Sequence, residues 1–157
     1  MKLLYYPDTI LEMPCSPVED FTSIPALIDE MTVLMKEHKG LGLAANQVGK
    51  SLNLFIMKDS KGDIKEFINP KIIEEIDVVN MSEGCLSFPD IFLNISRPET
   101  VVVEFKNKEG EVRQIVANGL EARTILHEMD HLQGEVFISK VNRATRKAAL
   151  SRLKRHK

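Results

Sequence analysis

The 157-residue chain has no tryptophan, only two cysteines and no long apolar run. A helix needs ~18 or more consecutive apolar residues to span a membrane, so we expect no membrane contact. Cys15 and Cys85 are too few for the disulfide framework of a small secreted protein. The first eight residues become acidic too early for a signal peptide. These absences favour a soluble, cytoplasmic protein.

Neither sign of charge dominates, because 21 Lys and Arg stand against 23 Asp and Glu. The resulting net charge of −2 argues against a protein that binds polyanions with its whole surface. Hydrophobic residues make up 43% and charged residues 28%, values that exclude intrinsic disorder, collagen and a coiled coil. The length suits one domain with its own apolar core.

The spacing of apolar residues predicts a mixed α+β fold. Between Ser23 and Lys39 they recur three and four residues apart, which indicates a core helix that ends at Gly40. Short β-rich runs follow, joined by polar, glycine-containing hairpin turns at 59–63 and 106–110. The expected strands are Leu52 to Met57, Glu66 to Ile68, Ile72 to Val79, Val101 to Phe105 and Val112 to Val116.

Two more helices are predicted in the last third of the chain. The first runs from about Leu120 to Leu132 and ends before Gly134, and the second begins near Ala144. We therefore expect antiparallel or mixed sheets packed around a central helix, with an N-terminal core helix and a short C-terminal helix. Residues 1–142 should form a single domain. Residues 143–157 should form a basic helical tail, since they carry seven Lys and Arg and no acid.

The motif H-E-M-D-H lies within the helix predicted at 120–132. Because four residues turn a helix by ~400°, His127 and His131 share one face, where two imidazoles can bind one metal ion. A chance pairing on a solvated face is the alternative. The same segment has an apolar side that favours burial: Ile125, Leu126, Met129 and Leu132. Asp130 lies ~100° from His131, which indicates a structural acid or a group that orients an imidazole.

Two imidazoles leave a metal site incomplete, and Cys85 is a candidate for the third ligand. It lies in a turn marked by Gly, Ser and Pro, where a side chain can be directed at a site. A purely structural role fits Cys85 as well when it is considered alone. Together with the two histidines it forms a Cys-His-His set whose open fourth position suits a catalytic water. Cys15, in a proline-flanked loop, is expected to be a small buried or half-buried side chain.

A third segment, from Gly40 to Gly49, is rich in small residues that let a ligand approach the backbone closely. Gln47 adds an amide donor to this segment. It lacks the Gly-Lys-Ser/Thr ending of a phosphate-binding loop. On its own, the segment is also compatible with a helix end and a tight connection.

The three segments G-L-G-L-A-A-N-Q, E-G-C-L-S and H-E-M-D-H resemble the three motifs of the peptide deformylases, complete and in the family's order. The resemblance extends over most of the chain, from Tyr6-Pro7-Asp8 to Asn118-Gly119-Leu120. It implies a metal-dependent hydrolase that removes the formyl group from the initiator formyl-methionine of new polypeptides and releases formate.

By this resemblance, Cys85, His127 and His131 hold one divalent metal ion. The family commonly uses ferrous iron, while zinc, nickel and cobalt also suit a thiolate and two imidazoles. The ion would lower the pKa of a bound water from ~15.7 toward ~7. Glu128 would take the proton from this water and later pass one to the leaving amine.

The resemblance also assigns the groups that contact the substrate. The side chain of Gln47 and the backbone N–H of Leu86 would stabilise the oxyanion. The backbone around Leu41 and Gly42, and the strand-like residues that end at Gly84, would pair with an extended peptide.

An apolar slot for methionine is expected beside the metal, with four wall residues: Leu41, Met81, Leu120 and Thr124. Arg123 is expected to extend to water rather than reach the mouth of the slot. Arg97 and Glu83 resemble an ion pair that supports the site. Phe92 departs from the family pattern, because many relatives have an arginine at the aligned position.

Two alternatives remain open at this point. H-E-x-x-H is also the signature of zincin-type metalloproteases, although Cys85 argues against that class. A non-enzymatic, metal-containing module that docks on the ribosome or another RNA would explain the basic tail. For the deformylase, the expected partners are formylmethionyl nascent peptides and, through the tail, the ribosome, and we expect a monomer.

Overall fold

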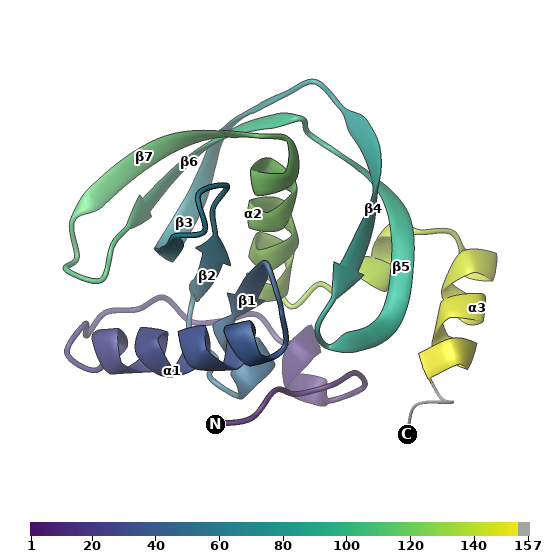
Figure 1. The fold of residues 1–157 in the computed structure, drawn as a ribbon, viewed down its shortest axis with the longest axis horizontal. Helices are drawn as coiled ribbons and strands as arrows, with labels where there is room; N and C mark the ends of the chain where they lie inside the picture. Colours follow the sequence, from purple (N-terminus) through teal and green to yellow (C-terminus); the bar gives the residue numbers. More distant parts are fainter. Residues whose placement is uncertain (154–157) are drawn as a thin grey trace.

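The computed structural model describes residues 1–153 as two antiparallel sheets arranged around one helix (Figure 1). The helices are α1 (Ile24–Glu37), α2 (Gly119–Leu132) and α3 (Arg143–Leu153). The strands are β1 (Gly42–Ala44), β2 (Leu54–Lys58), β3 (Ile64–Ile76), β4 (Val79–Cys85), β5 (Phe88–Arg97), β6 (Thr100–Lys106) and β7 (Val112–Asn118). Short 3-10 helices occupy Thr9–Glu12, Ala45–Val48 and Phe137–Lys140. The predicted α+β class is confirmed.

The larger sheet has five strands in the order β1-β2-β3-β6-β7, and β4 and β5 form a separate hairpin. Figure 1 shows α2 standing between this sheet and the hairpin. Within residues 1–153, β1 pairs only with β2, and β4 pairs only with β5. Each of these two strands therefore keeps one edge without a strand partner.

Three apolar clusters hold the elements together. The first joins the buried face of α1, including Met31 and Met35, to β1 and β2. The second joins α2, through residues such as Ile125, to the five-stranded sheet. The third joins β5 to α3, where Ala149 and Leu153 are buried.

The hairpin turns predicted at 59–63 and 106–110 connect β2 to β3 and β6 to β7, as expected. The two predicted strands at 66–68 and 72–79 are largely one strand, β3. A shift in register between Ile68 and Lys71 accounts for the gap, and Asn69 there has a φ of 49°. The first helix ends at Glu37, and Lys39 rather than Gly40 has the positive φ, of 56°.

Strands β1 and β5 are missing from the sequence-based expectation, in which β4 appears only as strand-like residues that end at Gly84. In β5, buried and exposed residues alternate, with Ile91, Leu93 and Ile95 pointing inward. Phe92 is apolar yet 66% exposed, so it hides the alternation that would have indicated a strand. Strand β1 has only three residues, all buried, and such a short run carries no period.

The predicted C-terminal helix is confirmed as α3, and it packs on β5 through Ala149 and Leu153. Residues 154–157 of the predicted basic tail lie outside the described part of the chain. None of the helices within residues 1–153 has the length and apolar character needed to cross a membrane.

Candidate metal centre

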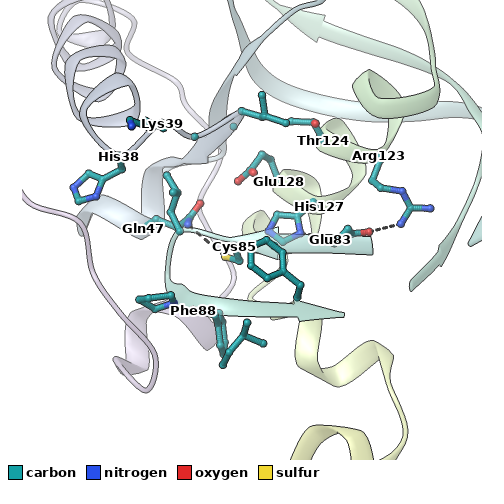
Figure 2. Close-up of a pocket in the computed structure, with 18 of the residues that line it drawn as sticks. His38, Lys39, Gln47, Glu83, Cys85, Phe88, Arg123, Thr124, His127 and Glu128 are labelled. Atoms are coloured by element: carbon teal, nitrogen blue, oxygen red, sulfur yellow. Dashed lines mark hydrogen bonds and ion pairs between the residues drawn. The ribbon is translucent and has the colours of Figure 1, made fainter. Parts of the chain in front are cut away.

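A cavity of about 530 Å³ opens between β1, the turn after β4, and α2 (Figure 2). Ten of the site residues expected from the sequence line it: Leu41, Gly42, Gln47, Gly84, Cys85, Leu86, Leu120, Thr124, His127 and Glu128. Segments that are far apart in the chain thus meet at one hollow, as the three motifs suggested.

Met81, expected in the wall of the methionine slot, is half-buried on β4 and is not among the residues that line the cavity. Alternation along β4 places it on the same face as Val79 and Glu83. The Arg123 guanidinium bonds both Val79 O and Glu83 Oε2. It therefore lies along the face of β4 on which Met81 is found.

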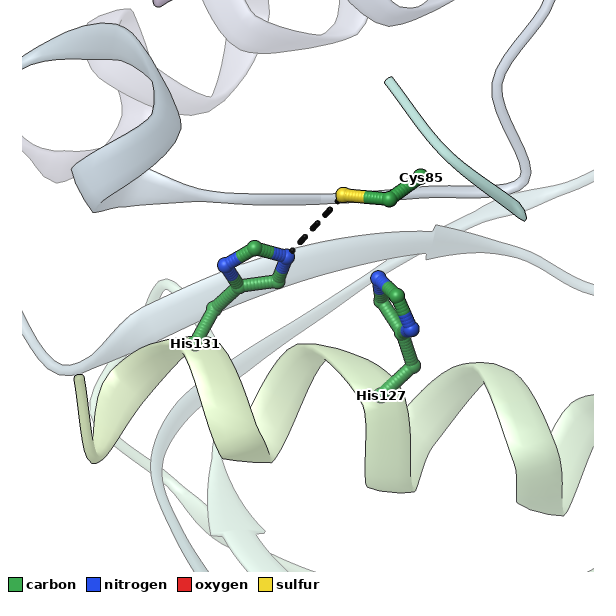
Figure 3. A group of neighbouring side chains, drawn as sticks. All are labelled: Cys85, His127 and His131. Atoms are coloured by element: carbon green, nitrogen blue, oxygen red, sulfur yellow. Dashed lines mark hydrogen bonds between the residues drawn. The ribbon is translucent and has the colours of Figure 1, made fainter. Parts of the chain in front are cut away.

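Cys85, His127 and His131 come together at the inner end of this site (Figure 3). Their candidate ligand atoms all lie within 4.8 Å of one another, and Cys85 Sγ is 3.3 Å from His131 Nε2. Cys85 ends β4, while the two histidines project from consecutive turns of α2. The rings of the histidines have centroids 5.0 Å apart, as the four-residue spacing predicts.

A buried ionic network lies directly behind His127. His127 Nδ1 is 2.8 Å from Glu83 Oε1, and Arg97 Nη2 donates to the same oxygen at 3.0 Å. Arg97 also binds Asp130 through Nη1 at 2.8 Å. Burial raises the pKa of Glu83, but the hydrogen bonds and charges of His127 and Arg97 outweigh it and lower the pKa to about 2. Glu83 is therefore a carboxylate that fixes the ring of His127.

One sequence-based expectation about this network is wrong, and another is narrowed to one of its two alternatives. Arg123 does not extend to water: it is 3% exposed, and its Nη1 donates to Glu83 Oε2 at 2.6 Å and to Ile95 O at 2.8 Å. Asp130 is a structural acid, as one alternative had it, and its carboxylate bonds Arg97 rather than an imidazole. The imidazole partner is Glu83, 44 residues before His127, and no local spacing reveals such a pair.

Glu128 lies on the next residue of α2 and is 4% exposed. Within residues 1–153, its Oε1 is buried without a hydrogen-bond partner. Burial raises its pKa to about 7, although the charge of His127 opposes the shift. A Cβ atom at Gly42 would lie 2.7 Å from Glu128 Oε2, so only glycine lets this carboxyl sit beside β1.

Gln47 is held in a fixed orientation by the backbone. Its Oε1 accepts a hydrogen bond from Ala44 N at 2.9 Å, which turns the amide nitrogen toward the cavity. Gln47 Nε2 donates to Ser87 Oγ at 3.1 Å and lies 3.8 Å from Cys85 Sγ. The amide is thus a preset donor beside the Cys-His-His cluster.

Asn46 is a supporting residue that is not among those expected from the sequence. It is fully buried, and its Nδ2 donates to the backbone oxygen of His131 at 2.7 Å. This bond ties the 3-10 helix Ala45–Val48 to the end of α2. The available signal was a second amide residue inside an otherwise apolar segment, directly before Gln47.

The donor set fits a divalent metal ion. One thiolate and two imidazoles are the ligands that zinc, iron, nickel and cobalt accept, and three protein ligands leave a position open. Burial lowers the pKa of His131, which keeps this imidazole neutral and its lone pair available. Glu128, whose Oε1 has no hydrogen-bond partner within residues 1–153, lines the same cavity as Cys85 and His127.

Comparisons with known proteins agree with the three motifs. A family model described as polypeptide deformylase matches residues 1–147. A peptide deformylase of Syntrophobacter fumaroxidans is 40% identical over 151 residues, which cover 93% of this chain and 89% of that relative. Peptide deformylase 1 of Bacillus anthracis is 40% identical over 146 residues, covering 91% of this chain and 93% of that relative.

Solved structures show the same likeness. The peptide deformylase of Ehrlichia chaffeensis in complex with actinonin has a TM-score of 0.96 at 34% identity, covering 100% of this chain and 97% of that one. The peptide deformylase of Legionella pneumophila has a TM-score of 0.95 at 34% identity, covering 99% and 94%. The motifs, the fold and these relatives agree, and the chain belongs to the polypeptide deformylase family.

Proposed function

We propose that this protein removes the formyl group from the N-terminal formyl-methionine of newly made polypeptides. Water adds its oxygen to the formyl carbon, the carbon–nitrogen bond breaks, and formate and a free amino group result. The observation that carries this proposal is the meeting of Cys85, His127 and His131 beside a buried, unpartnered carboxyl oxygen of Glu128.

Cys85, His127 and His131 are proposed to hold one divalent ion, with ferrous iron as the physiological ion and zinc, nickel or cobalt as substitutes. When bound, the ion supplies Lewis acidity and lowers the pKa of water at the open position toward ~7. Glu83 keeps His127 in the tautomer whose Nε2 faces the site, because its carboxylate accepts a hydrogen bond from Nδ1–H.

Glu128 is the proposed proton carrier. A carboxyl with a pKa of about 7 is poised to accept a proton from water near neutral pH and to return one to the amine nitrogen as it leaves. Its free Oε1 gives it the capacity to do so without breaking an existing hydrogen bond.

The oxyanion that forms on the formyl oxygen needs fixed donors. We assign this role to Gln47 Nε2 and to the backbone N–H of Leu86. The Gln47 amide is already turned toward Cys85 by its bond from Ala44 N. Leu86 follows Cys85 in the turn, and its side chain packs so closely that a Cβ at Gly40 would lie 2.6 Å from Leu86 Cδ1.

The peptide is proposed to bind as an extended strand between the free edges of β1 and β4, through the backbone of Leu41, Gly42 and Gly84. Main-chain hydrogen bonds of this kind hold a peptide largely regardless of its sequence. The methionine side chain would lie against Leu41, Leu120 and Thr124, three of the four residues expected in the slot.

The deciding experiment measures formate release from a formyl-methionyl peptide by anaerobically prepared, metal-loaded protein. Glu128→Ala should reduce the rate by about 10²–10⁴-fold. Glu109→Ala, which removes an exposed carboxylate in the β6–β7 turn, should leave the rate unchanged. Wild-type protein that releases no formate would refute the proposal, and cleavage of internal bonds in an unformylated peptide would indicate the zincin-type alternative.

We further propose that the protein acts in the cytoplasm as a monomer and contacts ribosomal RNA through its C-terminal helix. Exposed cations on α3 support this proposal: Arg143, Lys147 and Arg152. Formylated chains emerge from ribosomes, so such a contact would bring the enzyme to its substrate.

A further inference from the structure

Phe92 is an exposed aromatic side chain at the edge of the cavity. It is 66% exposed, it lines the cavity, and it lies on β5 directly opposite Gly84 of β4. A Cβ atom at Gly84 would be only 2.8 Å from Phe92 Cε1. The ring therefore lies across β4, in the space that a side chain at position 84 would fill.

The rest of this face of the hairpin is polar. Alternation along β4 and β5 puts the following residues on the side of Phe92: Asn80, Ser82, Asn94 and Ser96. Asn80 and Ser96 bond each other at 3.0 Å and are satisfied. Within the described hairpin, Phe92 is the one apolar side chain on this face, and it stands at the end nearest the cavity.

Large exposed apolar groups that adjoin a cavity commonly mark a binding surface. Three other cavity-lining residues are also large, apolar and exposed: Tyr5, Leu41 and Leu120. The rim of the cavity is thus apolar on several sides. Phe92 is therefore one of several exposed apolar residues around the opening of the cavity, and not an isolated one.

The register of the strands indicates what Phe92 would contact. A peptide on the free edge of β4 would run about 4.8 Å from it, as neighbouring strands do. Gly84 has no side chain, so the Phe92 ring lies over it, next to the edge along which the peptide would run. Aromatic side chains commonly pack over a glycine in this way and contact the next strand.

The alternation of side chains along an extended peptide identifies which substrate residue Phe92 would contact. The methionine side chain enters the cavity on the face of β4 that carries Glu83 and Cys85, toward α2. Because successive side chains of a strand point to opposite faces, the next residue projects to the face of Phe92. The contact therefore falls on the second residue of the substrate.

We propose that Phe92 is a specificity-determining residue that packs against the side chain of the second residue of the formylated peptide, favouring aromatic and large aliphatic residues there. This inference rests on the proposed function, because it assumes that methionine occupies the cavity. It assigns Phe92 no part in the chemistry.

The first test compares kcat/KM for formyl-Met-Phe-Ser, formyl-Met-Leu-Ser, formyl-Met-Ala-Ser and formyl-Met-Asp-Ser. An aromatic contact of this kind should favour Phe over Ala by about two- to tenfold in wild-type protein. Phe92→Ala should abolish that preference and leave the Ala peptide within about twofold of wild type, since Phe92 touches no reacting group. Phe92→Leu should keep a preference for Leu.

Val78→Ala is the matched control, because Val78 is 74% exposed between β3 and β4 and does not line the cavity. It should change none of the ratios. Equal kcat/KM for Phe and Ala peptides in the wild type, or an unchanged ratio in Phe92→Ala, would overturn the inference while leaving deformylation intact. Failure of every peptide to release formate would instead refute the proposed function.

A binding measurement tests the same contact without turnover. The chain has no tryptophan, so the indole of formyl-Met-Trp-Ser is the only such fluorophore in the mixture. Mixed with the Glu128→Ala protein, the peptide should show a blue shift as the indole leaves water. The shift should be lost in the protein that also carries Phe92→Ala. A blue shift of equal size in both proteins would contradict the proposed contact.

Discussion

His127 Nδ1 lies 2.8 Å from Glu83 Oε1, and this bond joins α2 to β4 immediately behind the candidate ligands. Glu83 is two residues before Cys85, so one short stretch of β4 supplies both a candidate ligand and the group that orients another. Two arginines, Arg97 and Arg123, hold the carboxylate in turn. The geometry of the site is thus linked to the stability of a buried charge cluster.

Arg123→Met should strongly destabilise the protein. The change removes one of the two buried arginines that bind Glu83 and takes the arginine donor away from Ile95 O and Val79 O. Such losses typically cost about 3–5 kcal/mol in the free energy of unfolding, which urea denaturation can measure. Arg113→Met is the control, because the side chain of Arg113 is 51% exposed. It should change the free energy of unfolding by no more than about 0.5 kcal/mol. An equally small effect at Arg123 would contradict the described network.

Glu128 should make the metal-free protein less stable as the pH rises. Burial raises the pKa of this carboxyl from 4.5 to about 7, so between these values the folded protein holds a proton that the unfolded chain has lost. Stability therefore falls across this window and stays lower above it. In chelator-treated protein above about pH 7, the free energy of unfolding of Glu128→Gln should be higher than that of wild type by on the order of 1–3 kcal/mol.

The two chelator-treated proteins should converge toward pH 4.5, where the carboxyl of the unfolded chain also gains its proton. Urea midpoints measured in steps across this range provide the check. A constant difference between wild type and Glu128→Gln at every pH would show that Glu128 titrates normally.

Gly42→Ala should impair catalysis more than stability. The added Cβ would lie 2.7 Å from Glu128 Oε2 and 2.9 Å from Thr124 Cγ2, so the Glu128 carboxyl must shift. Misplacement of a reacting group by about 1 Å can cost about 10²-fold in rate, which should appear in kcat/KM for a formyl-methionyl peptide. Gly110→Ala is a useful contrast, because its positive φ of 80° lies in a distant turn. It should lower the melting temperature and spare kcat/KM.

Reversing the exposed charges of α3 tests the ribosome proposal without disturbing the fold. The variant with Arg143, Lys147 and Arg152 all changed to Glu should bind ribosomes more weakly at low salt, because fewer phosphates are neutralised. Formate release from a free peptide should stay unchanged. Deletion of the helix is a poorer test, since it removes Ala149 and Leu153 from an apolar cluster. Unchanged ribosome affinity would argue against the contact.

Much of the candidate site could be predicted because its signals are local. His127 and His131 share a helical face through a spacing of four, and Gln47 and Cys85 lie in short segments with recognisable composition. The helices and the two polar hairpin turns follow from periodicity and turn residues for the same reason. The resemblance to the family's three motifs then predicts that these three segments form one site, which periodicity alone does not indicate.

The rest depends on contacts between distant parts of the chain. Arg123 is expected at the surface when only its own helix is considered, and its partner Glu83 lies 40 residues away. For Asp130 the sequence leaves two roles open, and its partner Arg97, which decides for the structural role, is 33 residues away. Strand β5 was missed because Phe92 is apolar on an exposed face, and its placement depends on Gly84 in the opposite strand.

The three apolar clusters of the fold each support a different wall of the cavity. Leu43, Ala45 and Val48, which flank Gln47, belong to the cluster under α1, while Ile125 and Leu126 before His127 belong to the cluster between α2 and the large sheet. Cys85 packs against the third cluster, which spans the hairpin and α3. The cavity therefore lies where the three clusters meet, and the hairpin that carries Cys85 is tied to α2 beside it by the buried bonds of Glu83 with His127 and Arg123. We expect amide protons of β4 to exchange faster once a bound ion is removed, before the three clusters unfold.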